Sequence, residues 1–330
     1  MMQLARLAAL AASVRDDGSS PVADEAGLRW TVPAGTARYV RTSAAFVLAT
    51  PGGYLRLTPV RDRALGEART NVRVAAALAA AGAPVTAPLP STSGRLVEVF
   101  EPGLPDVGRM HASLIASAPG RYLELADLGE ADLLRWGRSL ARVHQAGRSV
   151  DASALAAWPD AVVAGVGSVA PDAELLDAVG LAGERCLALL GPPTTLVHGD
   201  PQPDNAAWGP GGPVFFDLDD MALSWPLADA AMAVRDAQPI DCLDRPATDS
   251  AVGQALLRGY REVADLDFGE ERAVSSLQRL SAAATYGRLM LALEGPAHGG
   301  RGPAWLGALH DRLTGVAQSL RAALLIRPSP

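Results

Sequence analysis

The chain begins its β-rich part with a regular alternation of apolar and polar side chains, which is typical of half-buried strands. The run "RYVRTSAAFVLATPGGYLRLTP" follows this period of two, and residues 51–53 (Pro-Gly-Gly) interrupt it as a hairpin turn. The alternation places Arg56 on one face of the second strand and both Leu55 and Leu57 on the other. We therefore expect residues 28–60 to form strands joined by turns.

Helical periodicity follows this alternating region. "RALGEARTNVRVAAALAAAGAPV" predicts an Ala-rich helix that ends at Gly82, with Pro84 beyond it. Two strand-like runs come next, "RLVEVFE" and "MHASLIASA", separated by a Pro/Gly-rich turn at 102–108. From "GEADLLRWGRSLARVHQA" onward apolar residues recur at helical spacing. Further helices are expected near 172–190, 227–237, 248–264, 270–294 and 303–325.

The helical part contains one exception, where "TTLVH" and "PVFFDLD" predict short strands. The fold class indicated by these patterns is α+β. We expect a small N-terminal lobe with a β-sheet and one helix over residues 1–115. A larger, mostly helical lobe with one hairpin-like insert should cover residues 116–330.

Composition narrows the class of protein. The chain has 330 residues, 49% of them hydrophobic, and a formal charge of −7, which argues against a nucleic-acid partner. Two cysteines, Cys186 and Cys242, indicate neither a disulfide framework nor a zinc site. The opening "MMQLARLAALAASV" predicts an amphipathic helix, and no apolar run approaches the roughly 20 residues that span a bilayer. We expect a cytoplasmic protein without membrane contact.

One segment, "LVHGDPQPDNAAWGPGGPVFFDLDD", gathers carboxylates around Asn205, one of only two asparagines in the chain. Amide and carboxylate oxygens suit Mg²⁺, which also retains substrate phosphates. A neighbouring carboxylate that is free of the metal can accept a hydroxyl proton. The pattern of His198, Asp200 and Asn205, followed by Asp217 after an apolar strand, matches the template of phosphoryl-transfer enzymes.

These motifs resemble a known family, the aminoglycoside phosphotransferase and choline kinase family, which has a protein-kinase-like two-lobe fold. "HGDPQPDN" is similar to its catalytic loop, and "FFDLDD" followed by "WPLADAAM" is similar to its metal-binding strand and the next helix. The Asp-x-Asp-Asp form is most similar to the branch of the stress response kinase and homoserine-kinase-like enzymes. "LRLTP", "ASAPGR" and "WGRSLARVH" extend the resemblance over about residues 28–235.

The resemblance implies an ATP- and Mg²⁺-dependent kinase that transfers the γ-phosphate to a hydroxyl of a small molecule, such as an amino alcohol, a sugar or an aminoglycoside-like compound. Asp200 would orient the substrate hydroxyl and accept its proton. Asn205 and Asp217 would hold the metal ion, and Asp219 would assist them. His198 would support the loop from beneath, and Asp229 would hold the loop backbone.

The resemblance also implies nucleotide contacts from the first part of the chain. Arg56 stands where the family has a lysine, and a guanidinium binds phosphate well. "RTSAAF" replaces a glycine-rich loop, so Ser43 and its neighbour Thr42 would contact phosphate. The backbone from Ile115 to Ser117 would meet the adenine.

Several points stay open at this level. Either Asn71 or Glu67 would be the partner of Arg56. Gln202 and Asp204 are expected to be exposed loop residues. A protein Ser/Thr kinase of the stress-response type and a nucleotide-binding pseudokinase are the alternative functions. The acceptor, the choice between ATP and GTP, and the oligomeric state are not specified by the sequence.

Overall fold

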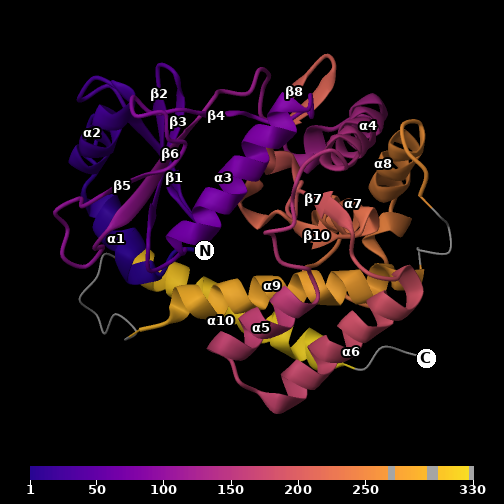
Figure 1. Cartoon of the computed structure of the whole chain (residues 1–330). Coiled ribbons are helices and arrows are strands. Elements are labelled where there is room, and N and C mark those ends of the chain that lie inside the picture. Colours follow the sequence, from indigo (N-terminus) through magenta and orange to yellow (C-terminus); the bar gives the residue numbers. More distant parts are fainter. Residues whose placement is uncertain (267–271, 296–303, 327–330) are drawn as a thin grey trace. The chain divides into compact units, whose positions relative to one another are not determined.

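The computed structural model describes residues 1–266, 272–295 and 304–326 (Figure 1). The chain forms two compact units, each assembled from segments that are distant in sequence. Unit 1 contains residues 1–76, 87–117 and 288–316, and unit 2 contains residues 77–86, 118–287 and 317–330. The predicted lobe boundary between residues 115 and 116 stays a prediction.

Unit 1 is built on an antiparallel six-stranded sheet. Its strands are β1 (Arg38–Thr42), β2 (Phe46–Thr50), β3 (Gly53–Pro59), β4 (Pro88–Leu89), β5 (Glu98–Phe100) and β6 (Met110–Ile115). The order is β1-β2-β3-β6-β4, and β5 also pairs with β6. Thr50 lies opposite Gly53, as the predicted hairpin requires. Leu55 and Leu57 are fully buried while Arg56 is half-buried, which confirms the predicted alternation.

Two features of unit 1 differ from the prediction for residues 28–60. Residues Leu28–Trp30 form a 3₁₀ turn (η1) after a short helix, α2 (Pro21–Gly27), which Ser20 caps by accepting a hydrogen bond from Val22 N. The long alternating run also breaks at Ser43, whose backbone N–H donates to Ala45 O and whose carbonyl accepts from Met2 N. A local turn therefore replaces the continuous strand.

Helices flank these strands in sequence. The opening helix is α1 (Leu4–Ala12), with Leu4, Leu7 and Leu10 buried along one face, so the predicted amphipathic helix is confirmed. Three longer helices contain residues of both units, α3 (Leu65–Ala80), α9 (Val274–Leu293) and α10 (Ala304–Leu325).

Unit 2 is mainly helical, which confirms the predicted α+β class. Its helices are α4 (Glu130–Gly147), α5 (Asp160–Val169), α6 (Ala173–Leu190), α7 (Pro226–Ala233) and α8 (Ala251–Arg261). Helix α5 was not predicted. Helices α4 and α8 lie side by side (Figure 1). A Cβ at Gly137 would lie 1.9 Å from Leu256 O, and one at Gly259 would lie 2.0 Å from Leu134 O. Glycine at these two positions therefore permits the close approach of the two backbones.

Four short strands cross unit 2. Strand β7 (Thr195–Val197) pairs with β10 (Ala222–Ser224), and β8 (Ala206–Gly209) forms a hairpin with β9 (Gly212–Phe215). The expected single insert thus consists of two separate ladders, and the predicted strands "TTLVH" and "PVFFDLD" are not partners. This arrangement brings both ends of the segment 198–221 to one place.

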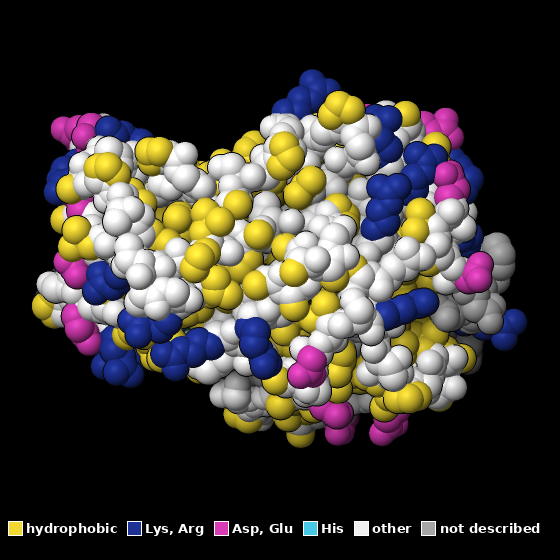
Figure 2. Space-filling model, turned by 45° about the horizontal axis from the view of Figure 1, so that its top comes forward, with side chains coloured by type: hydrophobic (Ala, Val, Ile, Leu, Met, Phe, Trp, Pro, Cys, Tyr) yellow, Lys and Arg dark blue, Asp and Glu magenta, His cyan; other side chains and the backbone are white. Residues whose placement is uncertain are grey.

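Three further observations concern the polarity of the helices, the charges on the surface and the cysteines. Each helix within residues 1–266, 272–295 and 304–326 is too short or too polar to span a bilayer. On the face shown in Figure 2, arginines occur in small groups, and acidic side chains occur near several of them. Both cysteines are free, and burial raises the pKa of the Cys186 thiol to about 12.

Candidate functional site

The loop that carries the predicted catalytic residues begins at His198, which follows β7 and is fully buried. Its Nδ1 accepts a hydrogen bond from Asp200 N at 3.2 Å. We therefore assign the ring proton to Nε2, which lies 3.1 Å from Phe216 O and donates to it. His198 thus connects the start of the loop with the chain after β9, the place that a supporting residue beneath the loop would occupy.

Asp229 on α7 holds the loop backbone with both carboxylate oxygens. Oδ2 accepts from His198 N at 2.7 Å, and Oδ1 accepts from Gly199 N at 2.8 Å. Gly199 has a φ of +87°, and a Cβ there would lie 2.0 Å from Asp220 O. The left-handed backbone and the close carbonyl both require glycine at this position.

A buried chain of polar groups extends behind Asp229. His144 Nε2 on α4 lies 3.0 Å from Asp229 Oδ2, and its Nδ1 lies 2.8 Å from the Tyr260 hydroxyl on α8. Because a carboxylate only accepts, His144 donates to Asp229. All three side chains are buried, so their mutual hydrogen bonds offset the cost of removing them from water. The sequence pattern did not mark His144 as part of the site.

The predicted base and the predicted metal ligand meet directly within the loop. Asn205 Nδ2 donates to Asp200 Oδ2 at 3.1 Å and to Asp200 O at 3.0 Å. The backbone carbonyl of Asn205 also accepts a hydrogen bond from Phe216 N at 3.0 Å. Phe216 lies at the other end of the β8–β9 hairpin and directly precedes Asp217. The structure therefore brings Asp200 and Asn205 together and places the start of the Asp217 segment beside them.

Asp217 adopts a left-handed backbone conformation, with φ of 62° and ψ of 53°. Among the described non-glycine residues only Thr31 shares a positive φ. Such a conformation costs about 1–2 kcal/mol for an L-residue, although aspartate tolerates it better than most. It turns the chain from β9 into the 3₁₀ turn η4 (Leu218–Asp220), which carries Asp219.

Arg235 is a site residue that the sequence did not indicate. It follows α7, and its Nη1 lies 3.7 Å from Asp200 Oδ1. Its Nη2 donates to Gln202 Oε1. Gln202 is only 3% exposed, so the expectation of an exposed loop residue was wrong for Gln202, while Asp204 is exposed as predicted. Nothing in the local pattern near Arg235 marked it, because the contact depends on how α7 packs against the loop.

A segment that precedes α4 pairs with β8, the strand that follows the loop. Arg121 and Trp208 exchange backbone hydrogen bonds of 3.0 and 2.8 Å. A Cβ at Gly120 would lie 2.6 Å from Trp208 O, so the glycine of "ASAPGR" permits the strand-like pairing with β8. Trp208 also packs edge-on against Trp136, with ring centroids 5.6 Å apart.

In unit 1 the predicted nucleotide contacts lie on strands or in a turn. Arg56 is opposite Val47 on β2 and Ser113 on β6, and Ser43 lies in the β1–β2 turn. Ile115 is paired on both sides of β6. Ala116, between Ile115 and Ser117, donates its N–H to Ala87 O at 2.9 Å. That N–H is therefore committed to the sheet, and the remaining backbone groups of Ile115 and Ser117 stay predicted adenine contacts.

The two suggested partners of Arg56 have different surroundings. Glu67, in the first turn of α3, forms an ion pair with Arg63, which precedes the helix, with 2.8 Å between Nη2 and Oε1. Asn71, in the middle of the same helix, is buried. Whether either residue meets Arg56 stays a prediction.

Comparison with known proteins identifies the family. Residues 39–266, more than half of the chain, match the model of the phosphotransferase enzyme family. The chain belongs to this family. The resemblance deduced from the motifs is thereby confirmed, and the protein is an enzyme, a phosphotransferase of the kinase type. The assignment to the stress response kinase branch stays a prediction. No curated protein gives a significant match to the sequence.

Solved structures with the same fold are distant in sequence. An amicoumacin kinase in complex with AMP-PNP, Ca²⁺ and its ligand has a TM-score of 0.70 at 18% identity, covering 91% of this chain and 92% of the other. A microcompartment-associated aminopropanol kinase has a TM-score of 0.60 at 18% identity, with 91% and 95% covered. A choline/ethanolamine kinase family protein from Mesorhizobium loti has a TM-score of 0.57 at 16% identity, with 93% and 100% covered. These likenesses confirm the protein-kinase-like fold of the phosphotransferase.

Proposed function

We propose that this phosphotransferase uses ATP and Mg²⁺ to phosphorylate a hydroxyl of a small molecule. The observation that carries the proposal is the direct contact of Asp200 with Asn205 on a loop whose backbone Asp229 holds at two points. A loop fixed in this way positions a base and a metal ligand before substrate binds. Such preorganisation is the main source of rate enhancement in phosphoryl transfer.

Asp200 is the proposed base. One of its carboxylate oxygens, Oδ2, accepts from Asn205, which fixes the rotation of the carboxylate. The other oxygen, Oδ1, lies toward Arg235. A substrate hydroxyl near Asp200 would be oriented for attack on the γ-phosphorus and would transfer its proton to the carboxylate.

The donor set around the loop fits a magnesium ion. The amide nitrogen of Asn205 is used on Asp200, which leaves its amide oxygen as the group that can bind a cation. Among the described residues, no cluster of three His, Cys, Asp or Glu side chains forms a closed metal site. Mg²⁺ needs none, because it is held by one or two protein ligands together with phosphates and water. Asn205 and Asp217, assisted by Asp219, are the proposed ligands, and the bound ion would neutralise phosphate charge.

The nucleotide contacts proposed for unit 1 are Arg56 and Ser43 for the phosphates and the backbone of Ile115 and Ser117 for the adenine. Support comes from solved relatives of this fold: the amicoumacin kinase structure contains AMP-PNP, and a spectinomycin phosphotransferase structure contains ADP. The aminopropanol kinase and the amicoumacin kinase act on small molecules, which favours a small-molecule acceptor over a protein.

The proposal is tested by following ATP and phosphorylated product by ³¹P NMR, with Mg²⁺ and a panel of hydroxyl compounds. Asp200→Asn should lower turnover by about 10²–10⁴-fold, the usual contribution of a general base. Asp204→Asn, an exposed carboxylate in the same loop, should leave turnover within about twofold of the parent, as expected for a solvated side chain. Nucleotide binding without turnover would indicate a pseudokinase, and phosphorylation of a peptide alone would indicate a protein kinase.

A further inference from the structure

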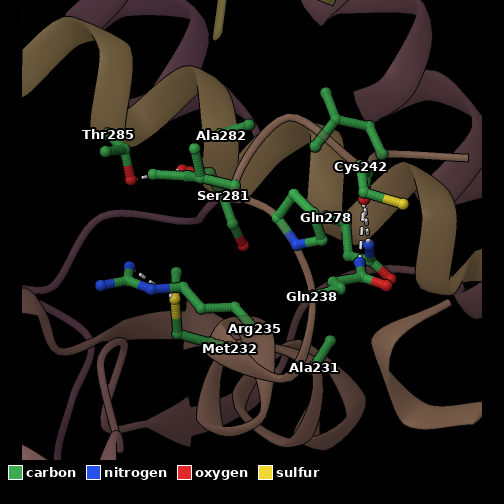
Figure 3. Close-up of a pocket in the computed structure, with 12 residues that line it drawn as sticks. Ala231, Met232, Arg235, Gln238, Cys242, Gln278, Ser281, Ala282 and Thr285 are labelled. Atoms are coloured by element: carbon green, nitrogen blue, oxygen red, sulfur yellow. Dashed lines mark hydrogen bonds between the residues drawn. The ribbon is translucent and has the colours of Figure 1, made fainter. Parts of the chain in front are cut away.

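A pocket opens beside Arg235 within unit 2, and it contains about 430 Å³ of empty space, part of which is open to solvent. Its wall comes from α7, from the segment that follows α7, and from α9. Figure 3 shows Arg235 and Met232 on one side and Ser281, Ala282 and Thr285 of α9 on the other. Arg235 thus belongs both to the pocket wall and to the surroundings of Asp200, since the two side chains are 3.7 Å apart.

The polar side chains of the wall are largely committed to the protein itself. Ser281 Oγ donates to Leu277 O, and Thr285 Oγ1 donates to Ser281 O, each at 3.0 Å. Gln278 Oε1 accepts from Ala247 N at 2.8 Å. A ligand therefore meets mainly the apolar surfaces of these residues and of their aliphatic neighbours.

The only charge on the described wall of the pocket is positive. Of the described residues that line the pocket, none carries a carboxylate and Arg235 alone carries a charge. A molecule with several ammonium groups would lose water on entering and would find a guanidinium in place of a counter-ion. An anionic group would find a suitable partner, because a guanidinium binds carboxylates through parallel N–H groups.

Two buried donors have no hydrogen-bond partner among the described residues: Nε of Arg235, which lines the pocket, and Nε2 of Gln202, which is hydrogen-bonded to Arg235. Arg235 Nε is 3.6 Å from Asp236 Oδ1, beyond hydrogen-bonding distance. Buried donors without acceptors are costly, and native structures usually satisfy them with water or a ligand. The two side chains are hydrogen-bonded to each other through Arg235 Nη2 and Gln202 Oε1, and Arg235 Nη1 donates to Met232 Sδ at 3.1 Å. Arg235 Nε is therefore the donor of the pocket wall that an anionic group would satisfy.

We propose that this pocket receives the acceptor and that the acceptor is an anionic hydroxy compound, a carboxylate-bearing alcohol with an otherwise apolar skeleton. This inference rests on the proposed kinase function. The carboxylate pairs with Arg235, and the hydroxyl lies toward Asp200. The hydroxyl oxygen forms a bond to the γ-phosphorus, the bond between that phosphorus and the bridging oxygen of ADP breaks, and the hydroxyl proton passes to Asp200. The products are a phosphate monoester and ADP.

The test uses three acceptors on one skeleton: β-hydroxyhexanoate, its primary amide, and the amino alcohol in which an aminomethyl group replaces the carboxylate. We expect kcat/KM for the acid to exceed that of the amide and of the amine by about tenfold or more, as for a charge-assisted hydrogen bond. Arg235→Gln should bring acid and amide to about the same kcat/KM, and Arg235→Lys should keep the preference for the acid. The readout is the ratio of kcat/KM for the acid to kcat/KM for the amide. Absolute rates do not serve, because Arg235 also influences Asp200 and so affects every acceptor.

A second variant changes the charge without touching Asp200. Ile240 is on the pocket wall and 45% exposed, whereas Ile326 is 58% exposed and outside the pocket. Ile240→Glu should weaken use of the acid and improve use of the amino alcohol, while Ile326→Glu should do neither. Calorimetry without nucleotide should show that Ile240→Glu binds β-hydroxyhexanoate more weakly than the parent does, and that Ile326→Glu binds it as the parent does.

The outcomes separate the acceptor class from the kinase function. Preference for the amide or the amine, or an acid preference that survives Arg235→Gln, overturns the proposed acceptor. If none of the three is phosphorylated while Mg²⁺-dependent ATP hydrolysis persists and is lost in Asp200→Asn, the acceptor class is wrong and the kinase function stands. If neither phosphorylation nor Asp200-dependent ATP hydrolysis occurs, both proposals fail.

Discussion

Each unit of this phosphotransferase contains a buried carboxylate that is held by several donors, but the donors come from different distances along the chain. Glu98 in unit 1 accepts from Ser91, Ser93 and Arg95, all within seven residues of it. Asp229 in unit 2 accepts from the backbone of His198 and Gly199 and from the ring of His144. Those partners lie 30 to 85 residues away along the chain.

The difference shows what each carboxylate does. Glu98 closes a local loop between β4 and β5, so its loss should affect that loop and the edge of the sheet. Asp229 connects α7, α4 and the loop that carries the proposed base Asp200, so its loss should affect stability and turnover together. Four predictions test this contrast, in order of expected size.

The largest effect is expected for Asp229→Ala. The change leaves two backbone N–H groups and the His144 ring without an acceptor in a buried region, at a cost of about 3–5 kcal/mol in the free energy of unfolding. Turnover should also fall, because the loop that carries Asp200 loses its support. Urea unfolding and steady-state kinetics measure both. Asp236→Ala, an exposed carboxylate near the same helix, should cost about 0.5 kcal/mol or less; a similar cost for both variants would contradict the role of Asp229.

Glu98→Gln should have the next largest effect on the free energy of unfolding, and this effect should depend on pH. Burial raises the pKa of Glu98, but hydrogen bonds from Arg95, Ser91 and Ser93 outweigh it and lower the pKa to about 2 from 4.5. The folded-state pKa is depressed, so the carboxylate stabilises the fold fully above pH 4.5, and this contribution is lost as the pH falls toward 2. Glu98→Gln should therefore cost about 2–3 kcal/mol at neutral pH and progressively less in acid.

The measurement is the free energy of unfolding of parent and variant at several pH values between neutrality and the acid limit of the folded protein. Turnover at neutral pH should remain close to that of the parent, in contrast to Asp229→Ala. A difference between parent and Glu98→Gln that does not change with pH would contradict the assignment of a depressed pKa.

Gly53→Ala should cost about 1–3 kcal/mol, because Gly53 has a φ of +151° and its Cβ would lie 2.1 Å from Ile115 O. Gly52→Ala, at the next position of the same hairpin, meets nothing within 4 Å and should be nearly neutral. Thermal unfolding distinguishes the two. Since Ile115 is a predicted adenine contact, Gly53→Ala should also raise the KM for ATP, whereas equal effects of both variants would argue against the tight β3–β6 approach.

The smallest effect is expected for Tyr260→Phe, which removes the hydroxyl that meets His144 at the far end of the buried chain. One such hydrogen bond contributes about 1 kcal/mol. A double-mutant cycle with Asp229→Asn should show coupling, because His144 connects the two groups. Strictly additive costs would mean that the three side chains do not act as one network.

The sequence predicted several elements because their information is local. The β2–β3 hairpin follows from a Pro-Gly turn between alternating runs, and α4 follows from apolar residues at helical spacing. Two other predictions were wrong because they concern contacts with segments that are distant in the sequence. "TTLVH" pairs with residues Ala222–Ser224 rather than with "PVFFDLD", and Gln202 is buried and hydrogen-bonded to Arg235 rather than exposed. The local sequence could predict neither outcome, because each depends on which segments meet after the chain has folded.

The sequence by itself determined which residues are the proposed base and metal ligands. Asp200, Asn205 and Asp217 lie within one short stretch, and a β-hairpin between them necessarily returns the chain to its starting point. Only the tertiary structure decided what supports and surrounds that stretch: Asp229 and His144 behind the loop, and Arg235 between Asp200 and an apolar pocket. Contacts within a hairpin are fixed by a few backbone angles, whereas contacts between helices depend on the packing of the whole unit.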